Sequence, residues 1–367
     1  MFTSDSRKST LATIKSTLPN AIRASSENLL LAEGNSFELL QCLPNHSVSL
    51  VLTDPPYHTT RKENIRGDRS FKNDDEYLDW MGRYSEKWYR VLKPNGSLLC
   101  FCSPAMAGRL ESVFSRRFNI LSHIVWAKPN DPGFDGWKQK MKKEALRQWY
   151  SHTERIIFAE PAYEGNVFRS YFGKLIREKR NQSGLSMHQV TQITGDYGKV
   201  NHGGAVSNWE AGRNVPSAKQ YERLCEALKQ TGKVHSMPKY GDVVRPFAMD
   251  SSKEFTDVWN FPSVRPYKGK HPAEKPLSLL EHAIEATTNR GDIVLDCFAG
   301  SGSTGLAALN LGRRAVLMEV DGTWIMRITE KLQTRLRKNG QKKNIEISSS
   351  VAQRILEIQT PLFADSK

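Results

Sequence analysis

Two apolar runs in this 367-residue chain each end in a short segment rich in chemically useful residues. Residues 48–52 lead into Asp54-Pro55-Pro56-Tyr57, and residues 293–295 lead into Asp296-Cys297-Phe298-Ala299-Gly300-Ser301-Gly302. Strands that end in functional residues are typical of doubly wound α/β sheets, whose ligands bind at the carboxyl ends of the strands. The two segments therefore predict one shared site at a sheet edge, built from distant parts of the chain.

Alternating strand and helix patterns around these segments support the same fold class. Apolar runs of strand length are separated by stretches with helical spacing, which predicts an α/β fold with a doubly wound, mostly parallel sheet. The expected strands are residues 29–31, 48–52, 97–101, 120–127, 155–159, 290–296 and 315–318, and the expected helices include residues 37–43 and 75–90.

The pattern changes to short helices between residues 167 and 231, which predicts an inserted all-α domain. The chain is accordingly divided into five parts: a flexible N-terminal tail (1–27), the first half of the α/β domain (28–165), the helical insert (166–232), the second half of the α/β domain (233–335) and a basic, polar C-terminal tail (336–367).

Charge and cysteine content narrow the class of partner. Lys and Arg outnumber Asp and Glu by 53 to 39, a formal charge of +14, which favours a polyanion such as nucleic acid. No run is long enough to span a bilayer and residues 1–27 lack an apolar signal core, so we expect no membrane association and a cytoplasmic location. The five cysteines lack paired metal-binding spacing, which predicts reduced thiols and no metal site.

The downstream segment favours binding of a nucleotide-like cofactor. Gly300 and Gly302 let the backbone pass close to a ligand, and the N-terminus of a helix that starts near Thr304 offers free N–H groups. Glu319 follows the next strand, where an acid can accept hydrogen bonds from ribose hydroxyls. The glycine spacing through Gly305 also fits a nicotinamide dinucleotide site, so the neighbouring segments must distinguish the two.

The upstream segment suits a planar amine. The Asp54 carboxylate and the Pro55 carbonyl can accept the two amine hydrogens, while two consecutive prolines hold both acceptors rigid. Tyr57 offers an aromatic face on which a flat ring can stack. The combination indicates a site for modifying an exocyclic amine.

These two segments, in this order, resemble the circularly permuted β-class amino DNA methyltransferases over residues 28–165 and 255–335. The resemblance implies S-adenosylmethionine as cofactor and transfer of its methyl group to adenine N6 or cytosine N4 of an extruded base in duplex DNA. Asp54 at the first position of its segment favours adenine. Cytosine N4 methylation and a DNA-binding regulator on a catalytically silent fold are the alternatives.

The same resemblance assigns roles to individual residues. Asp54, Pro55, Pro56 and Tyr57 would be catalytic, with Trp126 as a second wall around the base. The cofactor would contact the following residues: Asn35, Lys275, Asp296, Phe298, Ala299, Gly300, Ser301, Gly302, Thr304 and Glu319. Of these, Lys275 belongs to a segment expected at the methionine end of the cofactor, and Asn35 is expected at its adenine edge.

Three short segments of the helical insert form a pattern: Leu-Ser at 185–186, Ser-x-Trp-Glu-x-Gly-Arg-x-x-Pro at 207–216 and Leu-x-x-Ala-Leu at 224–228. With them the insert resembles the helix-turn-helix domain of phage repressors, although its turn over residues 196–204 is unusually long. It would be the target-recognition domain, with its third helix in the major groove. The candidate base readers are Asn201, His202, Ser207 and Asn208, and the candidate phosphate contacts are Arg169, Lys174, Arg177, Lys179, Arg180, Lys199 and Arg213. The resemblance leaves a homodimer and a cognate restriction nuclease open as further partners.

Overall fold

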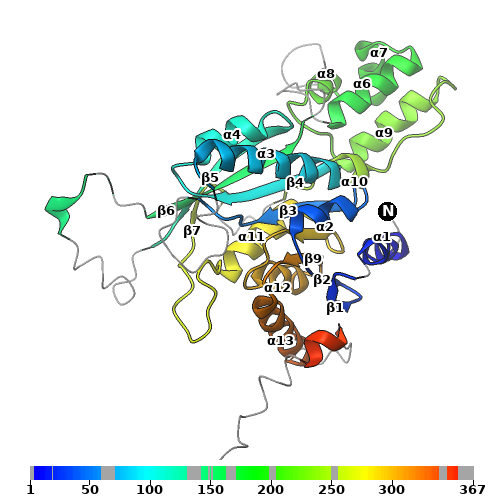
Figure 1. Cartoon of the computed structure of the whole chain (residues 1–367). Helices are drawn as coiled ribbons and strands as arrows, with labels where there is room; N and C mark the ends of the chain where they lie inside the picture. Colours follow the sequence, from blue (N-terminus) through cyan, green and yellow to red (C-terminus); the bar gives the residue numbers. More distant parts are fainter. Residues whose placement is uncertain are drawn as a thin grey trace, which may run out of the picture.

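The computed structural model describes residues 4–18, 20–58, 71–129, 142–147, 149, 152–162, 171–197, 204–248, 255–338 and 345–353. In this part of the chain a twisted sheet is covered by helices on both faces, and a separate group of helices stands beyond one end of the sheet (Figure 1). The predicted α/β class with a large, mostly parallel sheet is confirmed.

The sheet has ten described strands in the order β10-β1-β2-β9-β8-β3-β4-β6-β5-β7. Five central neighbours, β2, β9, β8, β3 and β4, run parallel, whereas β6 is antiparallel to both β4 and β5. The strand bounds are Ile22–Ser26 (β1), Leu29–Glu33 (β2), Val48–Thr53 (β3), Leu92–Cys102 (β4), Phe118–Ala127 (β5), Thr153–Pro161 (β6), Val258–Asn260 (β7), Ile293–Asp296 (β8), Arg314–Glu319 (β9) and Glu346–Ile347 (β10).

The chain winds in opposite directions from the two middle strands. From β8 it continues to β9 on one side, and from β3 it continues to β4 on the other. In such sheets the crevice at the carboxyl ends of the two middle strands is the usual ligand site. Both sequence segments singled out above follow these strands directly.

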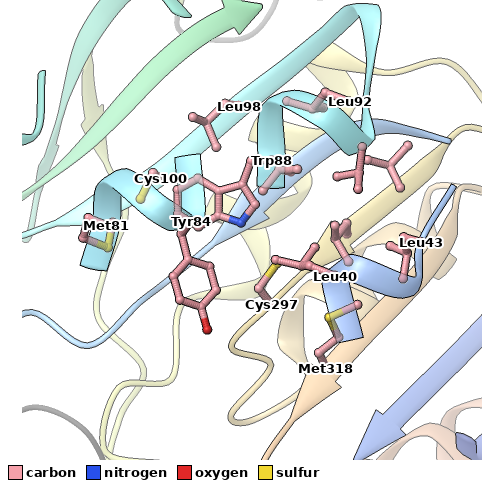
Figure 2. Packing of buried hydrophobic residues seen from close by; sticks show 14 of the residues in the cluster. Leu40, Leu43, Met81, Tyr84, Trp88, Leu92, Leu98, Cys100, Cys297 and Met318 are labelled. Carbon is pink, nitrogen blue, oxygen red and sulfur yellow. The ribbon is translucent and has the colours of Figure 1, made fainter. Parts of the chain in front are cut away.

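Two apolar layers hold helices against the sheet. On one face lie α2 (Ser36–Cys42), α3 (Asp74–Val91) and α4 (Ala107–Phe114), and on the other lie α11 (Leu277–Thr287), α12 (Ser303–Asn310) and α13 (Gly322–Lys338). Figure 2 shows part of the first layer, where Tyr84 and Trp88 of α3 lie beside Cys297 and Met318. These buried side chains pack beneath the glycine-rich turn at residues 298–302.

The N-terminal residues differ from the expected flexible tail. They form α1 (Ser4–Thr17) and the edge strand β1, and Leu11, Ile14 and Leu18 are buried against the sheet. Their helical spacing allows one apolar face to pack, although the Ser- and Thr-rich composition hides it. The C-terminal residues likewise add β10 to the edge of the sheet, where Glu346 pairs with Ser25 and accepts a hydrogen bond from Lys15 over 2.8 Å.

The chain between β6 and β7 builds a helical unit with its own core. Its helices are α6 (Tyr171–Ser183), α7 (Met187–Thr194), α8 (Gly204–Glu210), α9 (Ala218–Lys229) and α10 (Tyr240–Val243). Trp209 and Leu224 are buried in this core. Capping boxes at Ser186 and Ser217 fix the starts of α7 and α9.

The helical unit contacts the sheet through the turn inside β4. The Asn95 side chain donates hydrogen bonds to the carbonyls of Gly241 and Val244, both over 3.2 Å. Among the described helices, none is long and apolar enough to cross a membrane.

Candidate active site

A cavity of about 610 Å³ opens at the carboxyl ends of β3, β8 and β9. Both sequence segments line it, and a buried hydrogen bond joins them, because the Thr53 hydroxyl donates to Asp296 Oδ1 over 3.0 Å. Thr53 also accepts the Cys297 backbone N–H over 3.2 Å. The two segments, more than 240 residues apart in the chain, therefore form one site.

The glycine turn has no room for larger residues. Gly300 and Gly302 have φ angles of +49° and +71°, in the left-handed region that favours glycine. A Cβ atom at Gly300 would lie 2.9 Å from the His271 ring, and one at Gly302 would lie 2.8 Å from Ile328. Gly302 is also the N-cap of α12, so the turn brings bare backbone and a helix N-terminus to the cavity.

Glu319 is held rigidly at the end of β9. Its Oε1 accepts the backbone N–H groups of Val320 and Asp321, both over 2.9 Å, and its Oε2 accepts that of Gly300 over 2.7 Å. Burial raises the pKa of the carboxyl. The side chain lines the cavity in the position expected for an acceptor of ribose hydroxyls.

Asp296 lies beneath the turn. It accepts the Phe298 backbone N–H over 3.1 Å in addition to the Thr53 hydroxyl. Burial raises its pKa to about 6, although hydrogen bonds from Thr304, Phe298 and Thr53 oppose the change. Asp296 and Thr304 therefore shape the turn from within while also lining the cavity.

This burial predicts a pH-dependent contribution of Asp296 to stability. Its pKa is about 6 when folded and 3.8 normally, so the contribution is fully present below pH 3.8 and is lost as the pH rises through 6. Asp296→Asn keeps the acceptor but cannot ionise. We expect the unfolding free energy of the natural protein, relative to this variant, to fall by about 1 to 2 kcal/mol between pH 5 and pH 8. Urea unfolding at several pH values measures it, and a constant difference would contradict the assignment.

The other predicted cofactor residues also line the cavity. Asn35 is the N-cap of α2, and its side-chain Oδ1 accepts the Phe37 backbone N–H over 3.0 Å. The side-chain amide of Asn35 therefore also has a structural role. Phe298 packs against Trp80 and Tyr84, with ring centroids 5.7 Å and 5.2 Å apart. Ala299 and Ser301 complete the set.

The segment before α11 closes over the turn. The Ser303 hydroxyl donates to Glu274 over 3.2 Å, and Lys331 of α13 donates to the same carboxylate over 3.0 Å. His271 stacks edge-on against Trp324 at 4.4 Å, and burial lowers its pKa to about 4, so the ring over Gly300 is neutral.

The part of the cavity next to the end of β3 centres on Asp54. Its Oδ2 accepts a hydrogen bond from the Lys275 ammonium, whereas its buried Oδ1 has no hydrogen-bond partner among the described residues. Burial raises the pKa of Asp54, and the Lys275 charge opposes this. The unpaired Oδ1 is an acceptor that a ligand amine can use. Pro55, Pro56 and Tyr57 line the cavity beside it.

Lys275 lies between two carboxylates of the cavity, those of Asp54 and Glu154, with its ammonium 3.4 Å from the Glu154 carboxylate. Its expected place at the methionine end of the cofactor stays a prediction. The same ammonium is 5.4 Å from the centre of the Tyr57 ring. Its described contacts therefore belong to the amine side of the cavity.

The sequence did not predict two charged residues of this site, Glu154 and Lys128. Glu154 accepts hydrogen bonds from the Tyr57 hydroxyl over 2.8 Å and from Lys128 over 2.5 Å. Glu154 is the second residue of β6, which runs antiparallel to β4. The amino end of β6 therefore lies beside the carboxyl ends of the parallel strands. A search of strand carboxyl ends overlooks such a residue, and the apolar strand after Glu154 was the available signal.

Trp126 forms a wall of the cavity but is almost fully buried. Its indole donates to the Phe261 carbonyl over 2.8 Å, and the Lys128 ammonium lies 4.7 Å from its ring centre. The ring packs in the core while one edge borders the cavity. Stacking of a base on it stays a prediction.

The helical unit carries the remaining candidates. Arg177 and Arg180 bond to Glu210, with Arg180 Nε 2.5 Å from its carboxylate, so both help to hold α6 against α8. Lys174 pairs with Glu178 at 3.5 Å. Four candidates are accessible or partly so at the surface: Lys179, Ser207, Asn208 and Arg213. Arg169, Lys199, Asn201 and His202 lie outside the described residues.

Comparison with known proteins agrees with this site. Residues 48–330 match the N6/N4 family model described as DNA methylase. The chain is 31% identical over 316 residues to the type II methyltransferase M2.MboI of Moraxella bovis, covering 80% of this chain and 83% of the relative. It is 26% identical over 306 residues to the DNA adenine methyltransferase YhdJ of Escherichia coli K12, covering 83% and 82%.

A solved structure shows the same fold. The PvuII DNA methyltransferase, described as cytosine-N4-specific, superposes with a TM-score of 0.50 at 16% identity, covering 92% of this chain and 97% of that one. The family model spans most of the chain and includes both segments of the cavity. The chain therefore belongs to the N6/N4 family of DNA methyltransferases, which use S-adenosylmethionine.

Proposed function

We propose that this enzyme transfers a methyl group from S-adenosylmethionine to the N6 amine of adenine in duplex DNA. The observation that carries the proposal is the unpaired Asp54 Oδ1, which lies beside Tyr57 in the cavity that also contains the glycine turn and Glu319. One cavity thus offers an acceptor for an amine, a ring for stacking and a cradle for a nucleoside-like cofactor.

The residues of the turn fit the cofactor. Bare backbone at Gly300 and Gly302 would lie against it, Glu319 would accept its ribose hydroxyls, and Phe298 would line its pocket. When bound, S-adenosylmethionine supplies an electrophilic methyl group on its sulfonium. The glycine spacing alone also suits a dinucleotide, but an amine-binding segment at the same cavity supports methyl transfer instead.

The residues of the amine side would prepare the nucleophile. Asp54 Oδ1 and the Pro55 carbonyl would accept the two amine hydrogens, which turns the nitrogen lone pair out of conjugation with the ring. Tyr57 would stack on the base and offset part of the stacking lost when the base leaves the duplex. Because the amine nitrogen would itself be the nucleophile, no covalent enzyme intermediate is needed, and its extra proton would pass to solvent after methylation.

Adenine is favoured over cytosine by the Asp at position 54 and by the similarity to a relative named an adenine methyltransferase. Cytosine N4 is the second candidate, because the structural neighbour is named cytosine-N4-specific. Purified protein, mixed-sequence duplex DNA and S-adenosylmethionine, followed by nucleoside mass spectrometry, distinguish them. We expect N6-methyladenine; N4-methylcytosine would overturn the base assignment, and tight DNA binding without modification would favour a silent regulator.

We also propose that the helical unit is a helix-turn-helix target-recognition domain inserted into a circularly permuted methyltransferase. The amine-binding segment precedes the cofactor turn in the chain, and the unit lies between them. The sharp end of α7 at Gly195, the buried Trp209 of α8 and the separate core support this. Ser207 and Asn208 on α8 would read base edges in the major groove.

Arg213 gives a test of this role. It follows α8, is exposed and donates to Asn208 over 3.2 Å, so it would contact phosphate beside the reading residues. We expect Arg213→Ala to weaken duplex binding and to reduce the salt dependence of log K by about one. Lys229→Ala, which removes an exposed charge from the last turn of α9, is the control. Equal salt slopes for both variants would contradict a phosphate contact at Arg213.

Two further partners follow from the proposed role. Relatives of this chain are named type II methyltransferases, which supports a cognate restriction nuclease that cuts the same unmodified sequence. A homodimer would let two helical units read two half-sites. Sedimentation of the protein with and without duplex DNA tests the dimer.

A further inference from the structure

We propose that Glu154 is a positioning residue for methyl transfer, which holds the Tyr57 ring and the Lys275 ammonium in place around Asp54. The inference rests on the proposed function and adds a residue on which that function depends. Glu154 lies at the start of β6 and lines the cavity beside the amine-binding segment.

One carboxylate joins three separate segments of the chain. Its Oε2 accepts the Tyr57 hydroxyl over 2.8 Å and lies 3.4 Å from the Lys275 ammonium, while its Oε1 lies 2.5 Å from Lys128. Tyr57 belongs to the turn after β3, Lys275 to the segment before α11 and Lys128 to the end of β5. Glu154 is therefore the common partner through which these segments are held at fixed positions.

The charges at this point balance. Asp54 and Glu154 carry two negative charges, and Lys128 and Lys275 carry two positive charges in direct contact with them. The side chains of Lys275 and Glu154 are only 8% and 18% exposed. Removal of one member of a buried ion network leaves its partners uncompensated, so the remaining groups would rearrange.

Glu154 controls which oxygen of Asp54 is available. Lys275 binds Oδ2 and leaves Oδ1 for the amine. Without Glu154, Lys275 would lose its second carboxylate and could move over both Asp54 oxygens. Tyr57 would also lose its hydrogen bond to Glu154, one of the contacts that hold its ring, and a stacked base would be held less firmly relative to Oδ1.

A direct role as proton acceptor fits Glu154 less well. Although burial opposes ionisation, the Lys275 and Lys128 charges lower the pKa of Glu154 to about 2. Both its oxygens are already engaged by donors from this network. A carboxylate so stabilised is a weak base and a rigid anchor.

The first test compares Glu154→Gln with Glu160→Gln. Both residues are on β6. Glu160 does not line the cavity, and its carboxylate lies 2.8 Å from Arg245 Nε. We expect Glu154→Gln to lower the single-turnover methylation rate by about ten- to a hundredfold, with S-adenosylmethionine affinity changed less than about threefold. Glu160→Gln should keep the natural rate. A natural rate in Glu154→Gln would overturn the inference.

A second variant separates positioning from general loss of structure. Tyr57→Phe keeps the ring but removes the hydroxyl that Glu154 accepts. If Glu154 acts partly through Tyr57, the combined variant Glu154→Gln/Tyr57→Phe should be slower by clearly less than the product of the two single effects. Multiplicative effects, or an equal loss of cofactor affinity, would overturn positioning. Absence of methylation by the natural protein would instead refute the proposed function.

Discussion

Replacement of Asp54 by asparagine is expected to slow methyl transfer by about 100- to 1,000-fold, because it weakens the acceptor that holds the amine in the transition state. Asparagine keeps the size of the side chain but loses the charge. It also ends the ion pair with Lys275, which keeps Glu154 as a carboxylate partner. The glycine turn that lines the other part of the cavity is unchanged, so the affinity for S-adenosylmethionine should change little.

The measurement is a single-turnover assay with saturating cofactor and DNA, together with equilibrium binding of each ligand. Asp292→Asn is the matched control, since Asp292 is also buried but lies at the opposite end of β8, near Lys93. A variant at position 54 that methylates DNA at the natural rate would refute the amine-binding role. Loss of cofactor binding in that variant would show that Asp54 supports the cofactor turn instead.

The sequence predicts the shared site because parallel strands place their carboxyl ends at one edge. Asp54 and Gly300 follow neighbouring strands, β3 and β8, and the Thr53–Asp296 hydrogen bond joins them there. The apolar runs of strand length and the residues that follow them were sufficient to locate these two segments. No pairing information was needed, since in a doubly wound sheet both strands must point the same way.

The reversal of β6 explains what the sequence analysis missed. An antiparallel strand brings its first residues to the edge where parallel neighbours end, so Glu154 enters the site while the rest of β6 is apolar core. Strand direction depends on long-range pairing and is not encoded in local periodicity. The ion-pair partners of Lys275 could not be predicted for a similar reason, because Asp54 and Glu154 are distant from it in sequence.

The edges of the sheet were the least predictable part of the fold. Residues 1–27 were expected as a flexible tail, yet α1 and β1 pack at this edge, where Leu11 and Ile14 of α1 and Leu18 just after it are buried. The Ser- and Thr-rich composition of this segment indicates a flexible tail, and the few apolar residues are too short a pattern to predict a packed helix. Helix α3 was easier to predict, since Tyr77, Met81, Tyr84 and Trp88 recur at helical spacing, and these side chains are buried in the structure.

Replacement of Gly300 by alanine is expected to weaken S-adenosylmethionine binding by at least about tenfold, because the added methyl group would displace the His271 ring beside the turn and would strain the backbone. The new Cβ would lie 2.9 Å from the His271 ring, at a φ of +49°. His271 would have to move, and with it the segment that closes over the cavity.

Gly195→Ala distinguishes the effect of backbone strain from the loss of a cofactor contact, because it introduces a similar strain at the end of α7. Gly195 ends α7 with a φ of +70°, and a Cβ there meets nothing within 4 Å. Both variants should lose about 1 kcal/mol or more of stability from the left-handed conformation. Calorimetric titration with S-adenosylmethionine should show lowered affinity only for Gly300→Ala. Equal affinities would mean that the turn does not contact the cofactor, and the methyl donor would then have to bind elsewhere in the cavity.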